Sequence, residues 1–127
     1  LEAGAGRPYA AYVTGRGEQV LRLPPKQDLQ VRLFSPGVSV STKEAYAWLD
    51  DAISLGKVGH NAFSGMDAWM VEWRKDPGEW RFVNDFTIPV SARHEAIARA
   101  VCAMKEAGAS FADMSGSGST VFGVFSG

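Results

Sequence analysis

A short loop rich in serine and glycine, near the end of the chain, constrains the fold more than any other feature. The loop covers residues 115–120 and reads Ser-Gly-Ser-Gly-Ser-Thr. Its flanks, residues 111–114 and 121–125, are rich in aromatic and other apolar residues, so both are predicted to be strands. Gly116 and Gly118 let the backbone turn sharply with positive φ, so successive N–H groups can converge on an anion.

The side chains of the loop add hydroxyl donors around the two glycines. They belong to Ser115, Ser117, Ser119 and Thr120. Hydroxyls donate well to phosphate oxygens, so the loop suits a phosphate or another oxyanion. The alternative is a tight β-hairpin, because Gly and Ser are common in turns for conformational reasons alone. The loop is neither a Walker A motif, since no lysine follows Gly118, nor a dinucleotide fingerprint, since a strand and not a helix follows it.

Size and composition indicate one ordinary globular domain over residues 1–127. Apolar residues make up 46% of the chain and charged residues 21%, and the net charge is −1. This balance gives no electrostatic footprint for a nucleic acid or an anionic membrane. A lone cysteine, Cys102, fits a reducing, cytoplasmic compartment. It falls within a helical pattern and is predicted to pack in the hydrophobic core of the protein. The chain begins at Leu1 and not at a methionine, which indicates a fragment of a longer protein.

The order of predicted elements gives the fold class. Strands are predicted over residues 9–13, 18–23 and 29–34, and the last shows the period-two alternation of a half-buried strand. A capping box of Ser41 and Glu44 starts a helix, a second helix follows Ser64, and a third is predicted over residues 91–107, with Gly108 as its cap. Together with the closing pair of strands this predicts an α+β domain, an antiparallel sheet with helices packed on one face.

Few other residues combine into a site by spacing alone. His60 and His94 lie far apart without a carboxylate or cysteine at ligand spacing, so no metal site is predicted. Asp113 stands just before the loop; it could act in catalysis, but a carboxylate beside a phosphate site repels it, so a structural role is the alternative. Thr42 and Tyr46 are four residues apart on one edge of the first helix. A tyrosine there can stack on a planar base, or simply pack at the margin of the core.

These segments resemble the C-terminal half of the GHMP small-molecule kinases, a superfamily that includes galactokinase, homoserine kinase and mevalonate kinase. The segment 114–122 looks like the third conserved motif of that family. Three further segments match in the expected order, namely the Gly-Arg-Gly-Glu turn at 15–18, the Ser-Pro-Gly-Val-Ser-Val-Ser-Thr segment at 35–42 and Asn-Asp-Phe at 84–86. Within the family, the likeness is strongest to the branch that acts on a cytidine diphosphate conjugate of methylerythritol in the non-mevalonate isoprenoid route.

The resemblance implies a function and roles for individual residues. It implies a ferredoxin-like C-terminal domain and transfer of the γ-phosphate of ATP, with Mg²⁺, to a hydroxyl of the methylerythritol part of the substrate. Residues 115–120 would lie near the phosphates. Tyr46 matches an aromatic residue that packs on the cytosine ring, and Thr42 matches a nearby substrate contact.

The chain also lacks parts that the resemblance calls for. The Gly-Leu-Gly-Ser-Ser loop that binds ATP and the catalytic aspartate and lysine positions of the family are absent from the sequence. No catalytic residue is therefore expected in residues 1–127, which should be inactive without the N-terminal half of the kinase. Two alternatives stay open: another GHMP kinase, of homoserine or mevalonate type, or a non-catalytic α+β module that binds a small anion or only presents a hairpin.

Overall fold

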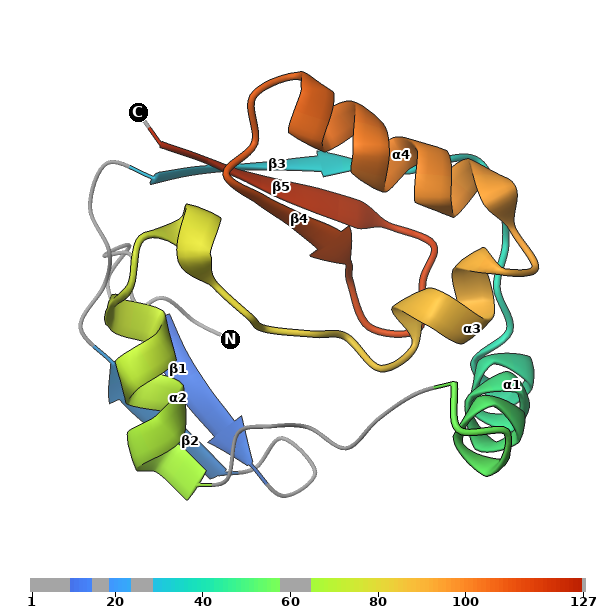
Figure 1. The fold of residues 1–127 in the computed structure, drawn as a ribbon, viewed down its shortest axis with the longest axis horizontal. Helices are drawn as coiled ribbons and strands as arrows, with labels where there is room; N and C mark the ends of the chain where they lie inside the picture. Colours follow the sequence, from blue (N-terminus) through green and yellow to red (C-terminus); the bar gives the residue numbers. More distant parts are fainter. Residues whose placement is uncertain (1–9, 15–18, 24–28, 58–64, 127) are drawn as a thin grey trace.

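A three-stranded antiparallel sheet in the order β3-β5-β4 lies at the centre of the fold (Figure 1). The computed structural model describes residues 10–14, 19–23, 29–57 and 65–126. The sheet strands are β3 (Leu29–Phe34), β4 (Phe111–Met114) and β5 (Val121–Ser126). The two predicted N-terminal strands are confirmed as β1 (Ala10–Thr14) and β2 (Gln19–Leu23), which form a separate antiparallel hairpin.

Helices accompany this sheet in the described part of the chain, and one of them packs directly on its strands. They are α1 (Thr42–Ser54), α2 (Gly65–Arg74), α3 (Thr87–Ser91) and α4 (Glu95–Glu106), with a short 3-10 helix η1 (Pro77–Glu79) between α2 and α3. Helix α4 packs on β4 and β5, α3 contacts α4, and α1 contacts α3. The predicted α+β class, an antiparallel sheet with helices on one face, is confirmed for this sheet.

The core joins both ends of the glycine loop to the helices. Met114, the last residue of β4, and Val121, the first of β5, face each other in register and are almost fully buried. Further members of the same cluster are Ala45, Val90, Ile97 and Ala100. Because these residues come from α1, α3 and α4, the two strand ends that carry the loop are fixed by side chains from three helices.

Two helix boundaries follow the sequence signals closely. Ser41 caps α1 and its hydroxyl accepts a hydrogen bond from the Glu44 N–H at 3.4 Å, as the capping box predicts. Gly108 follows α4 with φ +107, and its N–H donates to the Lys105 carbonyl. Such a left-handed residue just past the last turn is the usual way in which a helix ends.

The helix predicted over residues 91–107 is confirmed as α4 except at its start, because α4 begins at Glu95 and Ser91 is the last residue of the separate short helix α3. Helix α3 starts at Thr87, before the predicted start, and tolerates Pro89 because the first turn of a helix needs no N–H donor. The chain leaves the helical region at His94, where φ is −136°, and α4 begins at the next residue. The break turns α3 away from the axis of α4, toward α1 (Figure 1).

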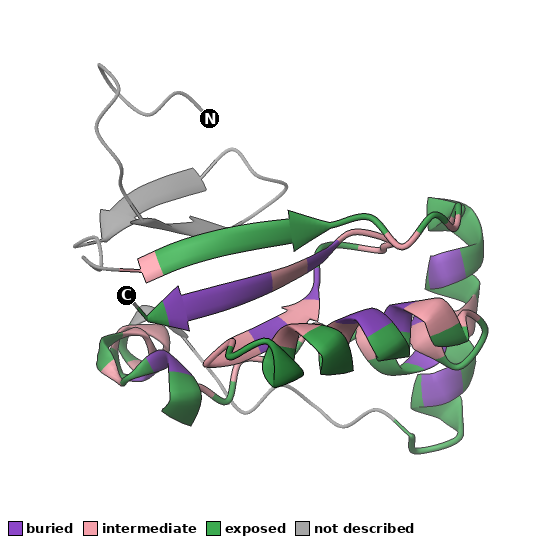
Figure 2. Cartoon of the chain, turned by 90° about the horizontal axis from the view of Figure 1, so that it is seen from above, coloured by how far each residue is buried: buried purple, intermediate pink, exposed green. Residues whose placement is uncertain are grey.

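Two predictions about burial are wrong. The strand at 29–34 is not half-buried: Val31, Leu33 and Phe34 are 52% to 70% exposed, because β3 is an edge strand and α4 lies over its neighbours (Figure 2). Cys102 is exposed and does not fill the core. It lies on α4 about 140° around the helix from the buried Ile97, so it faces away from the sheet.

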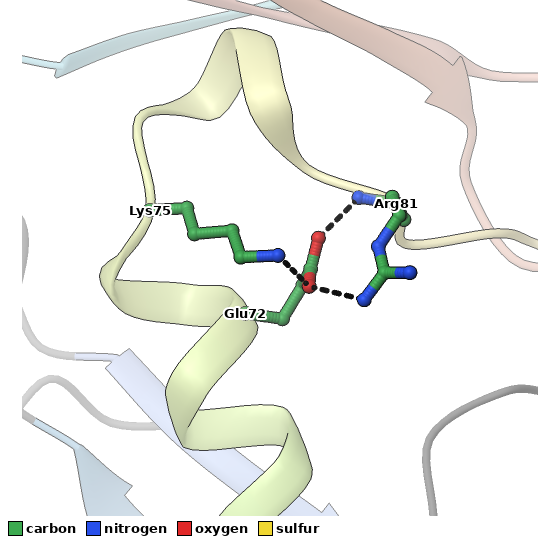
Figure 3. A network of polar contacts seen from close by, with 3 residues as sticks. All are labelled: Glu72, Lys75 and Arg81. Atoms are coloured by element: carbon green, nitrogen blue, oxygen red, sulfur yellow. Dashed lines mark hydrogen bonds and ion pairs between the residues drawn. The ribbon is translucent and has the colours of Figure 1, made fainter.

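A buried carboxylate ties α2 to the chain that leads back to the sheet (Figure 3). The Glu72 side chain is 1% exposed and accepts hydrogen bonds from Lys75 Nζ at 3.0 Å and from the Arg81 backbone N–H at 2.6 Å. Burial opposes its ionisation and raises its pKa, but the hydrogen bonds from Lys75 and Arg81 together outweigh this and hold the pKa of Glu72 below its ordinary value of 4.5.

Aromatic rings complete this attachment. Trp73 stacks on Trp80 at 5.3 Å between ring centroids, and Trp80 meets Phe111 of β4 edge-on at 5.5 Å. The tryptophans of α2 therefore pack, as the sequence predicts.

The predicted turn at residues 15–18 and His60 lie outside the described residues.

Glu72→Gln should lower the melting temperature at pH 7, because the amide keeps the shape of the carboxyl but loses the charge that Lys75 and Arg81 stabilise. A lowered folded-state pKa stabilises the fold above the unfolded pKa, and that stability is lost as the pH falls through the folded pKa. The difference in melting temperature between wild type and variant should therefore shrink below about pH 4.5. The exposed Glu79→Gln is the matched control; equal melting temperatures for all three proteins at pH 7 would contradict the assignment.

Candidate functional site

The glycine loop connects β4 to β5 and has the backbone shape that its sequence predicts. Gly116 and Gly118 adopt φ +56 and +97, in the left-handed region. Hydrogen bonds from the Ser115 N–H to the Thr120 carbonyl, at 2.8 Å, and from the Gly118 N–H to the Ser115 carbonyl, at 3.1 Å, close the loop on itself. The loop is thus a hairpin connection in topology. Both positions favour glycine because the backbone there has a positive φ.

The loop lies against the start of α1 and the segment before it, on the same side of the molecule as α3 (Figure 1). The hydroxyl oxygens of Ser117 and Thr42 are 3.4 Å apart, and the Ser119 hydroxyl donates to the Val38 carbonyl at 2.6 Å. Residues about 80 positions apart in the chain therefore form one surface. The N-terminus of α1 adds the positive end of its helix dipole to the hydroxyl groups there.

Tyr46 lies one turn along α1 from Thr42 and is 56% exposed. Its ring meets the Phe86 ring edge-on, with centroids 5.0 Å apart and an interplanar angle of 86°. Edge-to-face contact with one neighbour restricts the ring without covering it. Tyr46 is therefore held at the surface, near the loop, with ring area available to a planar partner.

Asp113 supports the loop through three hydrogen bonds that it accepts. Its carboxylate receives the Asn84 backbone N–H at 3.1 Å, the Thr87 hydroxyl at 2.5 Å and the Met114 backbone N–H at 2.7 Å. All three partners belong to the protein frame, so the geometry favours the structural role over the catalytic one.

Asn84 is a site residue whose role spacing alone does not reveal. In the sequence it stands out only as part of the Asn-Asp-Phe segment, whereas its side chain reaches the loop from a position 32 residues upstream. Its Nδ2 donates to the carbonyls of Met114 and Gly116, both at 2.7 Å. No sequence rule for a local turn or cap predicts a contact between segments so far apart.

A hollow of about 510 Å³ runs beside β4 on the other flank of this network. Its lining includes Trp80, Phe82, Asn84 and Asp113, but neither the loop 115–120 nor Thr42 or Tyr46. The loop surface is thus distinct from that hollow.

Two further observations on the described part of the chain concern metal binding and membrane spans. Within it, no cluster of three His, Cys, Asp or Glu side chains is placed to hold a metal ion. His94 stands at the start of α4, with its ring 6.0 Å from that of Trp48. None of the helices in the described residues is long and apolar enough to cross a membrane.

Comparison with known proteins agrees with the family resemblance found in the sequence. Residues 76–127 match the family described as GHMP kinases C terminal. The chain is 36% identical over 120 residues to a 4-diphosphocytidyl-2-C-methyl-D-erythritol kinase of Treponema pallidum, covering 91% of this chain and 41% of that protein. It is 34% identical over 137 residues to the kinase of the same name from Anaeromyxobacter sp. (100% and 40%), and 37% over 118 residues to that of Parabacteroides distasonis (90% and 39%). The chain thus spans about two fifths of the length of these relatives.

Gly118→Ala should destabilise the protein more than Gly116→Ala. A Cβ at Gly118 would stand 2.9 Å from Met114 Sδ and 3.5 Å from Val40 Cγ2, and Met114 is 1% exposed, so its side chain could shift only against other core side chains. At Gly116 a Cβ meets nothing within 4 Å, so the cost is the left-handed backbone alone, about 1 kcal/mol. Overpacking adds roughly 1–3 kcal/mol at Gly118. Chemical denaturation of both variants measures this difference, and equal losses would contradict the packing argument.

Proposed function

We propose that this chain, whose residues 76–127 belong to the GHMP kinase C-terminal family, forms the substrate-side domain of an ATP-dependent kinase. The acceptor is 4-diphosphocytidyl-2-C-methyl-D-erythritol, a step of non-mevalonate isoprenoid synthesis, and the γ-phosphate moves from ATP, with Mg²⁺, to a hydroxyl of its methylerythritol part. Three relatives align with at least nine tenths of this chain, and each carries the name of the kinase that acts on this substrate, which supports the assignment. The enzyme is taken to work in the cytoplasm.

The observation that carries the proposal is the meeting of Thr42 with Ser117 beside Tyr46. Hydroxyl groups and a glycine turn suit the phosphates of a nucleotide, and an exposed aromatic ring one helical turn away suits the base. A ligand with both a diphosphate and a pyrimidine fits this pairing. The sequence resemblance implies that Tyr46 packs on the cytosine ring and that Thr42 is a nearby substrate contact.

The groups that the structure brings to the loop are neutral. They are the hydroxyls of Thr42 and Ser117, which face each other, whereas the Ser119 hydroxyl and the Asn84 amide donate to carbonyls of the protein itself. Neutral donors position a phosphate, but phosphoryl transfer also requires stabilisation of the charge that develops on the transferred group. We therefore assign residues 115–120 to one wall of the site, and the ATP-binding loop and catalytic residues to the N-terminal part of the complete kinase. Residues 1–127 alone should be inactive.

The proposal is tested with protein made from the complete reading frame. Purified enzyme is given ATP, Mg²⁺ and each of three alcohols: 4-diphosphocytidyl-2-C-methyl-D-erythritol, homoserine and mevalonate. Formation of ADP and of a phosphorylated product with the first alcohol only is the expected result. Turnover of homoserine or mevalonate instead would reassign the substrate, and no turnover of any of them would favour an anion-binding module without chemistry.

Tyr46→Ala in the complete enzyme should raise KM for the cytidine substrate much more than KM for ATP. Stacking of a base on an aromatic ring contributes about 1–3 kcal/mol, which corresponds to roughly a 5- to 150-fold weaker interaction when it is lost. Tyr46→Phe keeps the ring and is the matched control, so its KM should stay close to that of wild type. Equal losses for ATP and the cytidine substrate in Tyr46→Ala would reject the stacking role.

A further inference from the structure

The side chain of Asn84 has every polar group engaged, and its partners determine how the amide is oriented. Nδ2 donates to two carbonyls, those of Met114 and Gly116, while Oδ1 accepts the Phe86 backbone N–H at 3.0 Å. Two acceptors on one side and one donor on the other permit only this placement of the amide nitrogen and oxygen. The side chain therefore acts as a bridge from the start of α3 into the glycine loop.

These contacts fix the direction of a peptide group in the loop. In a planar trans peptide the C=O and the following N–H point in opposite directions. Because the Gly116 carbonyl points to Asn84, the Ser117 N–H points away from Asn84. Among the described residues this N–H meets no acceptor, so it is available to a ligand on the side of the loop that Asn84 leaves open.

The backbone of Asn84 is itself fixed by a hydrogen bond to Asp113. Its backbone N–H donates to the Asp113 carboxylate, which also accepts the Thr87 hydroxyl and the Met114 N–H. The bridge thus connects the strand before the loop, the loop itself and the first residue of α3. A displacement of Asn84 would have to break this carboxylate network as well.

We propose that Asn84 is a positioning residue of the phosphoryl-transfer site, which aims the Ser117 N–H at a phosphate oxygen of the bound ligand. The inference rests on the proposed kinase function and adds to it the residue that orients the loop. A backbone donor that is already aimed costs no reorganisation when charge develops on the phosphate. Asn84 touches neither substrate nor reacting atoms in this assignment, and acts only through the loop.

Asn84→Asp is the sharpest test, because it keeps the shape and replaces the donor by a carboxylate oxygen that faces two carbonyl oxygens. The complete enzyme with this substitution should lose about 100-fold in kcat, the usual effect of losing one preorganised donor, with a much smaller change in KM. Asn84→Ala should lose less, since it removes the donor without adding repulsion. Asp76→Asn is the control, an exposed carboxyl without a side-chain cap bond on the same stretch of chain, and should keep wild-type kcat.

A second measurement separates this inference from the proposed function. Crystal structures of the complete wild type and Asn84→Asp, each soaked with a non-hydrolysable ATP analogue and with the cytidine substrate, show where the Ser117 N–H points. If Asn84 orients the loop, this N–H lies within hydrogen-bond distance of a phosphate oxygen in wild type only. A loop that superimposes in both proteins, or an Asn84→Asp enzyme with unchanged kcat, overturns the role of Asn84 even if the kinase is active. An inactive wild type overturns the proposed function, and the two crystal structures then decide the orientation of the loop independently.

Discussion

The pairing of Met114 with Val121 is the constraint on which the rest of the site depends. Both side chains are almost fully inaccessible, and both join a cluster with Ala45, Val90 and Ile97 from three helices. A loop of six residues between two buried anchors has little freedom to drift, because moving either end would open a void in a close-packed core. The burial of two apolar residues thus places a polar loop, and the same cluster brings α1, with Thr42 and Tyr46, to its side.

Hydrogen bonds then fix the orientation of the peptide groups in the loop, which apolar packing does not determine. Apolar packing fixes where the loop begins and ends, but not which way its peptide groups face, since dispersion forces have no direction. Asp113 and Asn84 supply that direction through hydrogen bonds to backbone groups on both sides of Met114. The apolar core therefore places the loop, while the amide of Asn84 and the carboxylate of Asp113 orient it. This division explains how an aspartate can stand next to a loop that we propose binds a phosphate, because the Asp113 carboxylate is engaged by Asn84, Thr87 and Met114.

The features predicted correctly from the sequence are those set by near neighbours. The capping of α1 by Ser41, the left-handed Gly108 and the positive φ of Gly116 and Gly118 depend on a few consecutive residues. Errors arose where distant segments decide the outcome. The burial of β3 depends on α4, which lies elsewhere over the sheet, and the exposure of Cys102 depends on which face of α4 meets the strands. The break at His94 and the reach of Asn84 into the loop likewise follow from tertiary packing, which a periodic pattern in one segment does not contain.

The arrangement of donors also explains how the chain can form part of an active site without acting alone. Hydroxyls, backbone N–H groups and the dipole of α1 favour an anion through partial charges, and a positioned N–H such as the one proposed at Ser117 stabilises only part of the charge that develops on a transferred phosphate. Phosphoryl transfer also requires groups that carry a full positive charge, such as a metal ion or a cationic side chain facing the same phosphate. A site built on this loop thus needs a second wall, and the relatives, of which this chain spans about two fifths, are long enough to provide one.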